Sequence, residues 1–420
     1  MPFKHSGFYA RQSFPVISGL WACLFGILLG ENSHGADWPQ FRGVHRDGVS
    51  SESITNIWPK TGPSVLWQAT VGQGYSGPIV ANGRMLLHHR PGDEDVVSAW
   101  DAASGKSLWR HSRPATFADD FGSDDGPRAT PAVDRNQIVT FSADGRLTSL
   151  DLTDGHVLWE VDTVKDLKAD KGFFGFACSP LVMGDVIIVQ IGGANGAGIV
   201  GFDRESGRVR WKATDHEAGY AAPIAAQLNG HSRAVCFDRA GLVILDPSQG
   251  RVETEFPWRA RMHASVNAAS PVLQGDQLFL TSSYGAGAIL LQLSAGKATA
   301  VWSGDEILSA HIATPILRAG YLYGFHGRQE QTPSLRCVDW TTGRVRWDAA
   351  RLGAGHVLAA SDKLLILLEK GELILAATNP KEFQVLARAQ VLGSNARATP
   401  AFAHGRWYGR DKSKLVCLGL

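Results

Sequence analysis

The 420-residue sequence has almost no net charge. It contains 41 lysines and arginines against 40 aspartates and glutamates, which gives a formal charge of +1. Proteins that bind nucleic acids or anionic membranes usually carry a strongly basic surface, because phosphate groups dominate the charge of both partners. The balanced charge therefore predicts no nucleic-acid partner.

Short catalytic motifs are also missing. The sequence contains no GxxxxGK[ST] phosphate loop, no HExxH zinc motif and no GxSxG nucleophile motif. Its five cysteines form no CxxC pair, so neither a zinc site nor a haem attachment is indicated. We predict no catalytic residue and no metal ligand from these patterns.

Long hydrophobic runs are scarce, and the main one lies near the N-terminus. Residues 16–30 are uncharged and mostly apolar, Lys4 and Arg11 precede them, and residues 33–36 are mainly small. This arrangement predicts a cleaved signal peptide at residues 1–36, and hence an exported mature chain without a transmembrane span. The alternative is an uncleaved anchor, for which 15 apolar residues are short.

Few cysteines remain after such cleavage. They are Cys178, Cys236, Cys337 and Cys417. An exported chain can pair its cysteines in disulfides. Cys337 and Cys417 occupy equivalent positions of the repeat described below, but they lie two repeat units apart, too far for a disulfide. We expect buried free thiols.

Glycine and tryptophan, by contrast, are abundant, with 47 and 13 residues respectively. Residues 128–161 (RATPAVDRNQIVTFSADGRLTSLDLTDGHVLWEV) contain three β-rich runs separated by turns at Asp144-Gly145 and at residues 151–155. An Asp-Gly pair between apolar runs is a strong hairpin signal, because glycine accepts the positive φ of a tight turn. One such small sheet cannot bury its apolar faces alone, so it needs copies of itself.

The copies follow along the chain, most of them 43 to 53 residues apart, and each starts with small residues and a proline. The prolines are Pro78, Pro131, Pro180, Pro223, Pro271, Pro315 and Pro400. An eighth start, without proline, falls near residues 355–357. Four copies end in Asp-x-x-x-Gly-x-x-x-Trp, and we expect their tryptophans to be buried between neighbouring units: Trp109, Trp159, Trp211 and Trp347.

The two ends of the chain complement each other. Only 20 residues follow Pro400, too few for a fourth strand, whereas residues 63–71 form a strand that belongs to no unit. An N-terminal strand that completes the last sheet would close a ring and remove its open edges. An open solenoid offers no reason for such a split.

We therefore predict an all-β fold in which residues 63–420 form an eight-bladed β-propeller of four-stranded antiparallel blades. The N-terminal strand completes the last blade. Residues 37–62 are expected to form a strap that packs Trp38 and Phe41 against the surface of the propeller.

The residues just ahead of the repeat starts form the candidate binding site. In a propeller the loops before the innermost strands crowd one rim of the central channel. The predicted ligand- or partner-binding rim consists of Tyr75, Arg128, Phe176, Tyr220, Asn267, His311 and Arg397. Arginine binds carboxylates bidentately and tyrosine offers a stacking face, so this set favours an anionic or planar ligand, or an acidic partner. The alternative is that each side chain satisfies carbonyl groups of nearby loops.

Two loops carry further polar residues. His326, Arg328 and Glu330 interrupt the sixth unit and are secondary candidates, since histidine and glutamate can serve acid–base chemistry. Residues 117–126 (FADDFGSDDG) hold four aspartates. Calcium binding and a solvated turn are both compatible with this loop, but its spacing does not match an EF-hand and favours the turn.

The repeat pattern resembles the PQQ-type (pyrroloquinoline quinone) propeller repeat, and the resemblance covers residues 37–420. It rests on the small-Ser/Thr-Pro starts and the Asp-x-x-x-Gly-x-x-x-Trp ends. Residues 38–43 (WPQFRG) and 126–131 (GPRATP) are similar to an exported bacterial subfamily. This repeat builds both quinoprotein alcohol dehydrogenases and the non-enzymatic BamB-like propeller of the outer-membrane assembly machinery.

The resemblance implies two competing functions. The first is a binding or scaffold protein of the cell envelope or periplasm, without cofactor, whose partner is an envelope protein or peptide. The second is a PQQ-dependent alcohol or sugar dehydrogenase with calcium, a rim aspartate as base, and Arg128 or Arg397 near the quinone oxygens. The adjacent cysteine pair of those dehydrogenases is absent here, and the intervals between repeats are short. These departures favour the binding protein.

Overall fold

The computed structural model describes residues 36–54, 57–263 and 265–420. The predicted signal peptide, residues 1–36, lies outside these ranges except for Ala36. Among the helices of the described residues, none has the length and apolar character that a membrane crossing requires.

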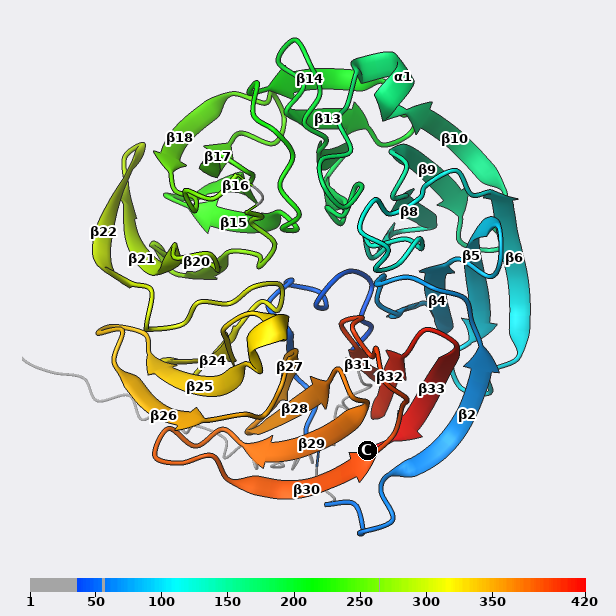
Figure 1. Cartoon of the computed structure of the whole chain (residues 1–420). Helices are drawn as coiled ribbons and strands as arrows, with labels where there is room; N and C mark the ends of the chain where they lie inside the picture. The colour runs from blue at the N-terminus through cyan, green and yellow to red at the C-terminus, as the bar shows by residue number, and fades with distance from the viewer. Residues whose placement is uncertain (1–35, 55–56, 264) are drawn as a thin grey trace, which may run out of the picture. The chain divides into compact units, whose positions relative to one another are not determined.

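Eight antiparallel sheets of four strands surround a central axis (Figure 1), which confirms the predicted propeller. Named from the axis outward, the first four blades are β3 (Ile79–Ala81), β4 (Arg84–His89), β5 (Glu94–Asp101) and β6 (Ser107–Pro114); β7 (Ala132–Asp134), β8 (Gln137–Phe141), β9 (Arg146–Asp151) and β10 (Val157–Asp162); β11 (Leu181–Met183), β12 (Val186–Gln190), β13 (Ile199–Asp203) and β14 (Val209–Ala213); and β15 (Ile224–Leu228), β16 (His231–Phe237), β17 (Gly241–Leu245) and β18 (Val252–Pro257).

The other four blades follow the same order. They are β19 (Val272–Gln274), β20 (Gln277–Ser282), β21 (Gly287–Ser294) and β22 (Lys297–Gly304); β23 (Ile316–Arg318), β24 (Tyr321–His326), β25 (Ser334–Asp339) and β26 (Val345–Ala349); β27 (Gly355–Ala360), β28 (Lys363–Leu368), β29 (Glu372–Ala377) and β30 (Val385–Gln390); and β31 (Ala401–Ala403), β32 (Arg406–Arg410), β33 (Lys414–Gly419) and β2 (Ser64–Thr70). Two short helices, α1 (Thr163–Leu167) and η1 (Gln329–Gln331), lie in connections.

The ring is closed as predicted. Strand β2, near the N-terminus, pairs antiparallel with the C-terminal strand β33, and Ser64 lies opposite Gly419. A strand from one end of the chain therefore completes a blade built from the other end, which gives the last sheet four strands.

The tryptophans at the repeat ends join neighbouring blades. Each indole Nε1–H donates to a backbone carbonyl in the next blade; Trp159, for example, donates to Arg204 at 2.8 Å. Its ring lies on the turn glycine of that blade, where a Cβ added to Gly207 would meet Trp159 Cε3 at 2.6 Å. Trp159 and Trp211 are buried as expected, whereas Trp109 and Trp347 are only partly buried.

We call the boundary between two neighbouring blades a seam. Six seams hold such an indole, supplied by Trp67, Trp109, Trp159, Trp211, Trp302 and Trp347. We call this contact between two blades a joint. The motif Asp-x-x-x-Gly-x-x-x-Trp encodes it, and its glycine leaves room for the tryptophan of the preceding blade.

The cysteine prediction is also confirmed. All four cysteines among the described residues are free and buried, and burial raises the pKa of the Cys178 thiol to about 11. They are small apolar core residues here, because a buried thiol in such surroundings stays protonated and unreactive.

The strap crosses the axis over residues 38–50 (Figure 1). Trp38 is buried and forms two backbone hydrogen bonds with Val80 of β3, at 2.8 and 2.9 Å. At the other end of the crossing, β1 (Val49–Ser50) pairs in parallel with β27, so the seventh blade has a fifth strand. Phe41, expected to pack on the surface, lines a central cavity instead.

Two buried arginines fix the strap to the innermost strands. Arg42 donates to the carbonyls of Thr314 and Pro315, at 2.8 and 2.9 Å, just where the sixth blade begins. Arg46 donates to the corresponding carbonyls of the third and fourth blades, those of Ser179, Pro180 and Pro223. Together with bonds to the first, second, seventh and eighth blades, these contacts tie the strap to seven of the eight blades.

Candidate functional site

The residue three places before each start proline lies on the wall of an axial cavity. The inner strand and its preceding loop are extended, so alternate side chains face the axis. In the seven blades that have the proline, this position is occupied by Tyr75, Arg128, Ala177, Tyr220, Ala268, Ile312 and Arg397, and all seven line the cavity. Loops that are distant in sequence therefore meet around one space.

The structure places five of the seven predicted rim residues at this cavity and two elsewhere. Tyr75, Arg128, Tyr220, His311 and Arg397 line it. Phe176 and Asn267 do not, because their side chains pack inside the blades, although His311 lies at the same position, four places before its proline, and does line the cavity. Phe176 packs on Phe141 with ring centroids 5.1 Å apart, and Asn267 donates to the carbonyl of Asp238 at 2.9 Å.

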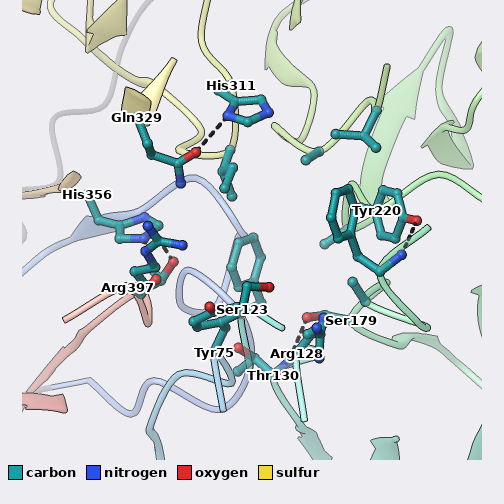
Figure 2. A pocket seen from close by; sticks show the side chains of 18 of the residues that line it. Tyr75, Ser123, Arg128, Thr130, Ser179, Tyr220, His311, Gln329, His356 and Arg397 are labelled. Carbon is teal, nitrogen blue, oxygen red and sulfur yellow. Dashed lines mark hydrogen bonds between the residues drawn. The ribbon is translucent and has the colours of Figure 1, made fainter. Parts of the chain in front are cut away.

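The cavity has a volume of about 290 Å³ and is partly open to solvent, and Figure 2 shows the side chains that surround it. Aromatic side chains form much of its wall, including Phe41 from the strap and Phe121 and Phe174 from loops. The rings of Phe121 and Phe174 lie 4.9 Å apart at their centroids, and Phe121 is 60% exposed. These exposed rings give the mouth of the cavity an apolar lip.

A set of hydroxyl groups lies beside the axis at the residue before the proline. The backbone N–H of Gly77 donates to Thr130 Oγ1, and the N–H of Thr130 donates to Ser179 Oγ, both at 2.9 Å. The same bond, at 2.8 Å, joins Ser270 to Thr314 across another seam. Each hydroxyl therefore accepts from the preceding blade, which explains the small-Ser/Thr-Pro start, and its own O–H stays available for donation.

Two arginines flank the ring of Tyr75. The guanidinium carbons of Arg128 and Arg397 lie 5.7 and 5.8 Å from its centroid. The terminal nitrogens of Arg128 donate to the carbonyls of Gly126 and Asp124, at 2.9 and 2.8 Å. This residue therefore satisfies carbonyl groups of its own loop, which was the alternative to a binding role. Arg397 donates from Nε to the Glu369 carboxylate at 3.1 Å, and the side chain of Tyr75 is a further partner of its guanidinium.

A chain of hydrogen bonds connects three blades beside the cavity. Tyr284 O–H donates to His311 Nε2 at 2.8 Å, and His311 Nδ1–H donates to Gln329 Oε1 at 2.7 Å (Figure 2). Gln329 Nε2 then donates to Glu369, which also accepts from Arg397 Nε at 3.1 Å. This direction keeps His311 neutral, and burial lowers its pKa.

His356 marks the start of the seventh blade. Register with β28 places Val357 at the position that proline holds elsewhere, so His356 corresponds to Thr130 and Ser179. Its Nε2–H donates to the carbonyl of Arg397 at 2.7 Å. Burial, together with the charge of Arg42, lowers its pKa to about 4, so the cavity wall is neutral here at physiological pH.

The secondary candidates separate in the structure. Glu330 lines the cavity and lies 3.3 Å from Arg328 Nε, and the Arg328 guanidinium covers the ring of Tyr284 at 4.5 Å. His326 lies away from the cavity, where its Nδ1 accepts the N–H of Ser309 at 3.0 Å. It therefore supports the loop and does not face a ligand.

The acidic loop differs from a solvated turn. Asp119 and Asp124 are buried, and Asp119 Oδ2 accepts backbone N–H groups of Ser123 and Asp124 at 2.7 and 3.2 Å. The carboxylates therefore hold the loop in shape. Ser123 and Phe121 from this loop line the cavity, so the buried Asp119 and Asp124 help to shape one wall of the site.

Sequence reasoning missed several lining residues. Phe41, Phe121, Phe174 and Gln329 lie in loops of irregular length, and no repeat position marks them. His356 was findable, because the Ser361-Asp362 turn of its hairpin fixes the register of the seventh blade.

Comparison with known families gives a match once this geometry is described. A family described as "Outer membrane protein assembly factor BamB" matches residues 50–214 and 93–348, which together span the first six blades. The chain belongs to this family of PQQ-like propellers. The predicted family is thereby confirmed.

Individual relatives fall into two groups. BamB of Shewanella oneidensis is 26% identical over 405 residues, which cover 90% of this chain and 93% of that protein. The dehydrogenase subunit of the quinone alcohol dehydrogenase of Komagataeibacter europaeus is 30% identical over 190 residues. These cover 43% of this chain and only 24% of that subunit, so the chain spans about a quarter of the length of this relative.

Solved structures share the fold. BamB of Moraxella catarrhalis superposes with a TM-score of 0.61 at 17% identity, and the match covers 86% of this chain and 100% of that one. The quinohemoprotein alcohol dehydrogenase of Comamonas testosteroni gives a TM-score of 0.64 at 13% identity, over 91% and 80% of the two chains. At such identities the likeness concerns the propeller architecture alone.

Proposed function

We propose that the protein is an exported, non-enzymatic binding propeller of the cell envelope that holds an envelope protein or peptide at the cavity mouth. The correspondence with Shewanella oneidensis BamB along nearly the whole of both chains supports this role. The match to the dehydrogenase subunit covers only about a quarter of that protein, so it gives less support for a dehydrogenase activity.

The observation that carries the proposal is the state of the carboxylates at the cavity. Glu330 is paired with Arg328, and Glu369, in a side pocket, is paired with Arg397. A general base must be free to accept a proton from a substrate, and an ion pair with arginine opposes that. The arrangement suits recognition better than proton transfer.

The same wall does not fit a quinone cofactor with calcium. Calcium takes six to eight oxygen ligands, mostly carboxylates and carbonyls. Within the described residues no aspartate lines the cavity, and Glu330 is the one acidic side chain that does. The rim aspartate that a PQQ dehydrogenase would need as base is therefore missing, and we propose that the protein works without PQQ, calcium or another metal.

The charge beneath the cavity favours an acidic partner. Arg42 and Arg46 are buried and donate to neutral oxygens, and burial lowers the pKa of each to about 10, so both stay protonated at neutral pH. A buried charge without a carboxylate partner produces a strong potential in a medium of low dielectric constant. With the guanidinium of Arg397, which lines the cavity, this potential favours a carboxylate of a partner peptide or of a small anionic ligand.

Photocrosslinking in the native host tests the role. A benzophenone amino acid replaces Phe121, which is 60% exposed at the mouth, and in a matched protein it replaces Leu108, which is 45% exposed on the outer strand β6. We expect one discrete adduct with an envelope protein at position 121, and none at position 108. When Arg397→Gln is introduced as well, the yield of that adduct should fall. The variant must have an unchanged melting temperature for this comparison.

An adduct at position 108 in the absence of one at position 121 would place the working surface on the circumference. The enzymatic alternative is tested separately by titration of the purified mature chain with PQQ and calcium. Cofactor binding followed by dye reduction in the presence of alcohols or sugars would contradict the proposal.

A further inference from the structure

The seam between the fourth and fifth blades lacks its tryptophan. In the third blade Trp211 follows the bulge of the outer strand and lies opposite Gly201. In the fourth blade the equivalent register position, opposite Ile244, is occupied by Thr254. A side chain of three heavy atoms thus stands where an indole joins the blades at six other seams.

The facing turn of the fifth blade has changed as well. Elsewhere the turn aspartate begins a loop that ends at the glycine beneath the indole, as from Asp246 to Gly250 under Trp211. In the fifth blade β21 and β22 instead continue their ladder to Ser294 and Lys297, and a tight turn closes them at Ala295-Gly296. Both halves of the joint have therefore been lost together.

The loss leaves a hollow of about 330 Å³, which we call the seam hollow. Its lining includes the three positions that make the joint elsewhere. They are Thr254 at the place of the tryptophan, Leu293 at the place of the carbonyl acceptor, and Gly296 at the turn. The buried side chain of Ile244 lines the hollow and gives it an apolar base.

The hollow has raised walls. Strand β15 has five residues, whereas β11 and β19 on either side have three, so the hairpin of β15 and β16 extends further on this face. The extended hairpin of β21 and β22 forms the opposite wall.

We propose that the seam hollow is a docking site for an aromatic side chain, tryptophan above all, presented by a partner polypeptide. The aromatic ring of the partner would occupy the position that an indole occupies at six other seams. It would make the same kinds of contact there. The site lies apart from the rim cavity and shares no lining residue with it, so it does not depend on the function proposed for the rim.

The polar groups of the hollow suit a neutral occupant. Glu253 is held by Arg233 and Arg251, so its charge is already compensated. The carbonyl of Leu293 has a single long contact, with Gln292 Nε2 at 3.3 Å, and can accept an indole N–H as its counterparts do. An aromatic ring with one donor therefore matches the hollow better than a charged side chain.

The probe for this site is the blocked tripeptide acetyl-Gly-Trp-Gly-amide, with the Ala counterpart as matched control. Amide resonances of isotope-labelled mature chain are followed during titration. We expect saturable shifts at Leu293, Ser294 and Gly296 with the tryptophan peptide and none with the alanine peptide. The variant Thr254→Trp fills the hollow from within and should weaken the binding at least tenfold.

Two outcomes would overturn the proposal. One is an unchanged affinity in folded Thr254→Trp, and the other is the absence of shifts at these residues at peptide concentrations that saturate any other site. If Thr254→Trp does not fold, Ser294→Tyr supplies the second test, because Ser294 is exposed and lines the hollow, so that a large side chain there narrows it. Unchanged binding in that variant would equally contradict the site.

Discussion

The indole N–H of Trp159 reaches the carbonyl oxygen of Arg204, 2.8 Å away in the next blade. The same ring covers Gly207, whose positive φ of 69° and lack of a Cβ admit it. A donor, an apolar face and a glycine therefore act as one joint. Four of the six joints were visible in the sequence as Asp-x-x-x-Gly-x-x-x-Trp.

Removal of one joint should measure its strength. Trp159→Ala deletes a buried ring that is 8% exposed and leaves the Arg204 carbonyl without its donor. We expect a loss of about 3–5 kcal/mol in the free energy of unfolding, from denaturation followed by circular dichroism. Leu158→Ala, at the exposed neighbouring position, should cost less than about 1 kcal/mol. Similar losses in both variants would mean that the register is wrong.

The strap should depend on Arg42. Arg42→Met keeps much of the length of the side chain but removes the donors to Thr314, Pro315 and Asp47. Loss of a buried charged donor typically costs about 3–5 kcal/mol, and we expect that decrease in the free energy of unfolding. Arg344→Met, at an exposed turn, is the control and should be nearly neutral. A neutral Arg42→Met would show that the strap does not hold the ring.

The stability of the protein should fall in weak acid partly because of His356. Its pKa is about 4 in the fold against an ordinary value of 6.5. Between these values the unfolded chain binds a proton and the folded chain does not, so stability is complete above pH 6.5 and declines as the pH falls towards 4. The difference corresponds to roughly 3 kcal/mol at most.

His356→Gln isolates this contribution, because the amide can still donate to the carbonyl of Arg397 but does not titrate. Denaturant midpoints measured at several pH values should decline less steeply for the variant than for the natural protein. His89, whose burial lowers its pKa to about 3, contributes in the same direction and remains in both proteins. Parallel curves would show that His356 does not carry the effect.

Binding at the rim should respond to salt and to Arg397. Its guanidinium lines the cavity, with Nε held by Glu369, so its terminal nitrogens are the donors that an acidic partner would use. For the partner identified by photocrosslinking, we expect Arg397→Gln to weaken binding by about tenfold and the natural protein to lose affinity as salt rises. Calorimetry that shows no salt dependence would contradict an acidic partner.

The architecture was predictable because it repeats. Start prolines, glycine turns and the unmatched strand at residues 63–71 each report a local preference, and eight copies of it leave little freedom in assembly. The rim was predictable in position but not in register. Phe176 and Asn267 were chosen one residue too early, and a single-residue step turns an extended side chain to the other face.

The strap could not be predicted from its own residues. Arg42 and Arg46 find their partners more than 130 residues away, among backbone carbonyls that any sequence possesses. No local pattern indicates that these two arginines will be buried without carboxylate partners. The lost joint at Thr254 was visible as a missing tryptophan, but only the structure shows the open hollow that results.

The route of the strap and β2 also fixes the order of events in folding. These segments are made first, yet Glu52 bonds to His404 and Gly405, and Val71 bonds to Ser413, all close to the C-terminus. A growing chain therefore carries an unpaired edge strand until its last blade is complete, while Arg46 and Arg42 gain all their acceptors only when the fourth and sixth blades have begun. Closure over such sequence distances is slow and leaves the chain prone to aggregation meanwhile. The chain should consequently need protection by a chaperone throughout synthesis, and loss of even its final strand should prevent native folding.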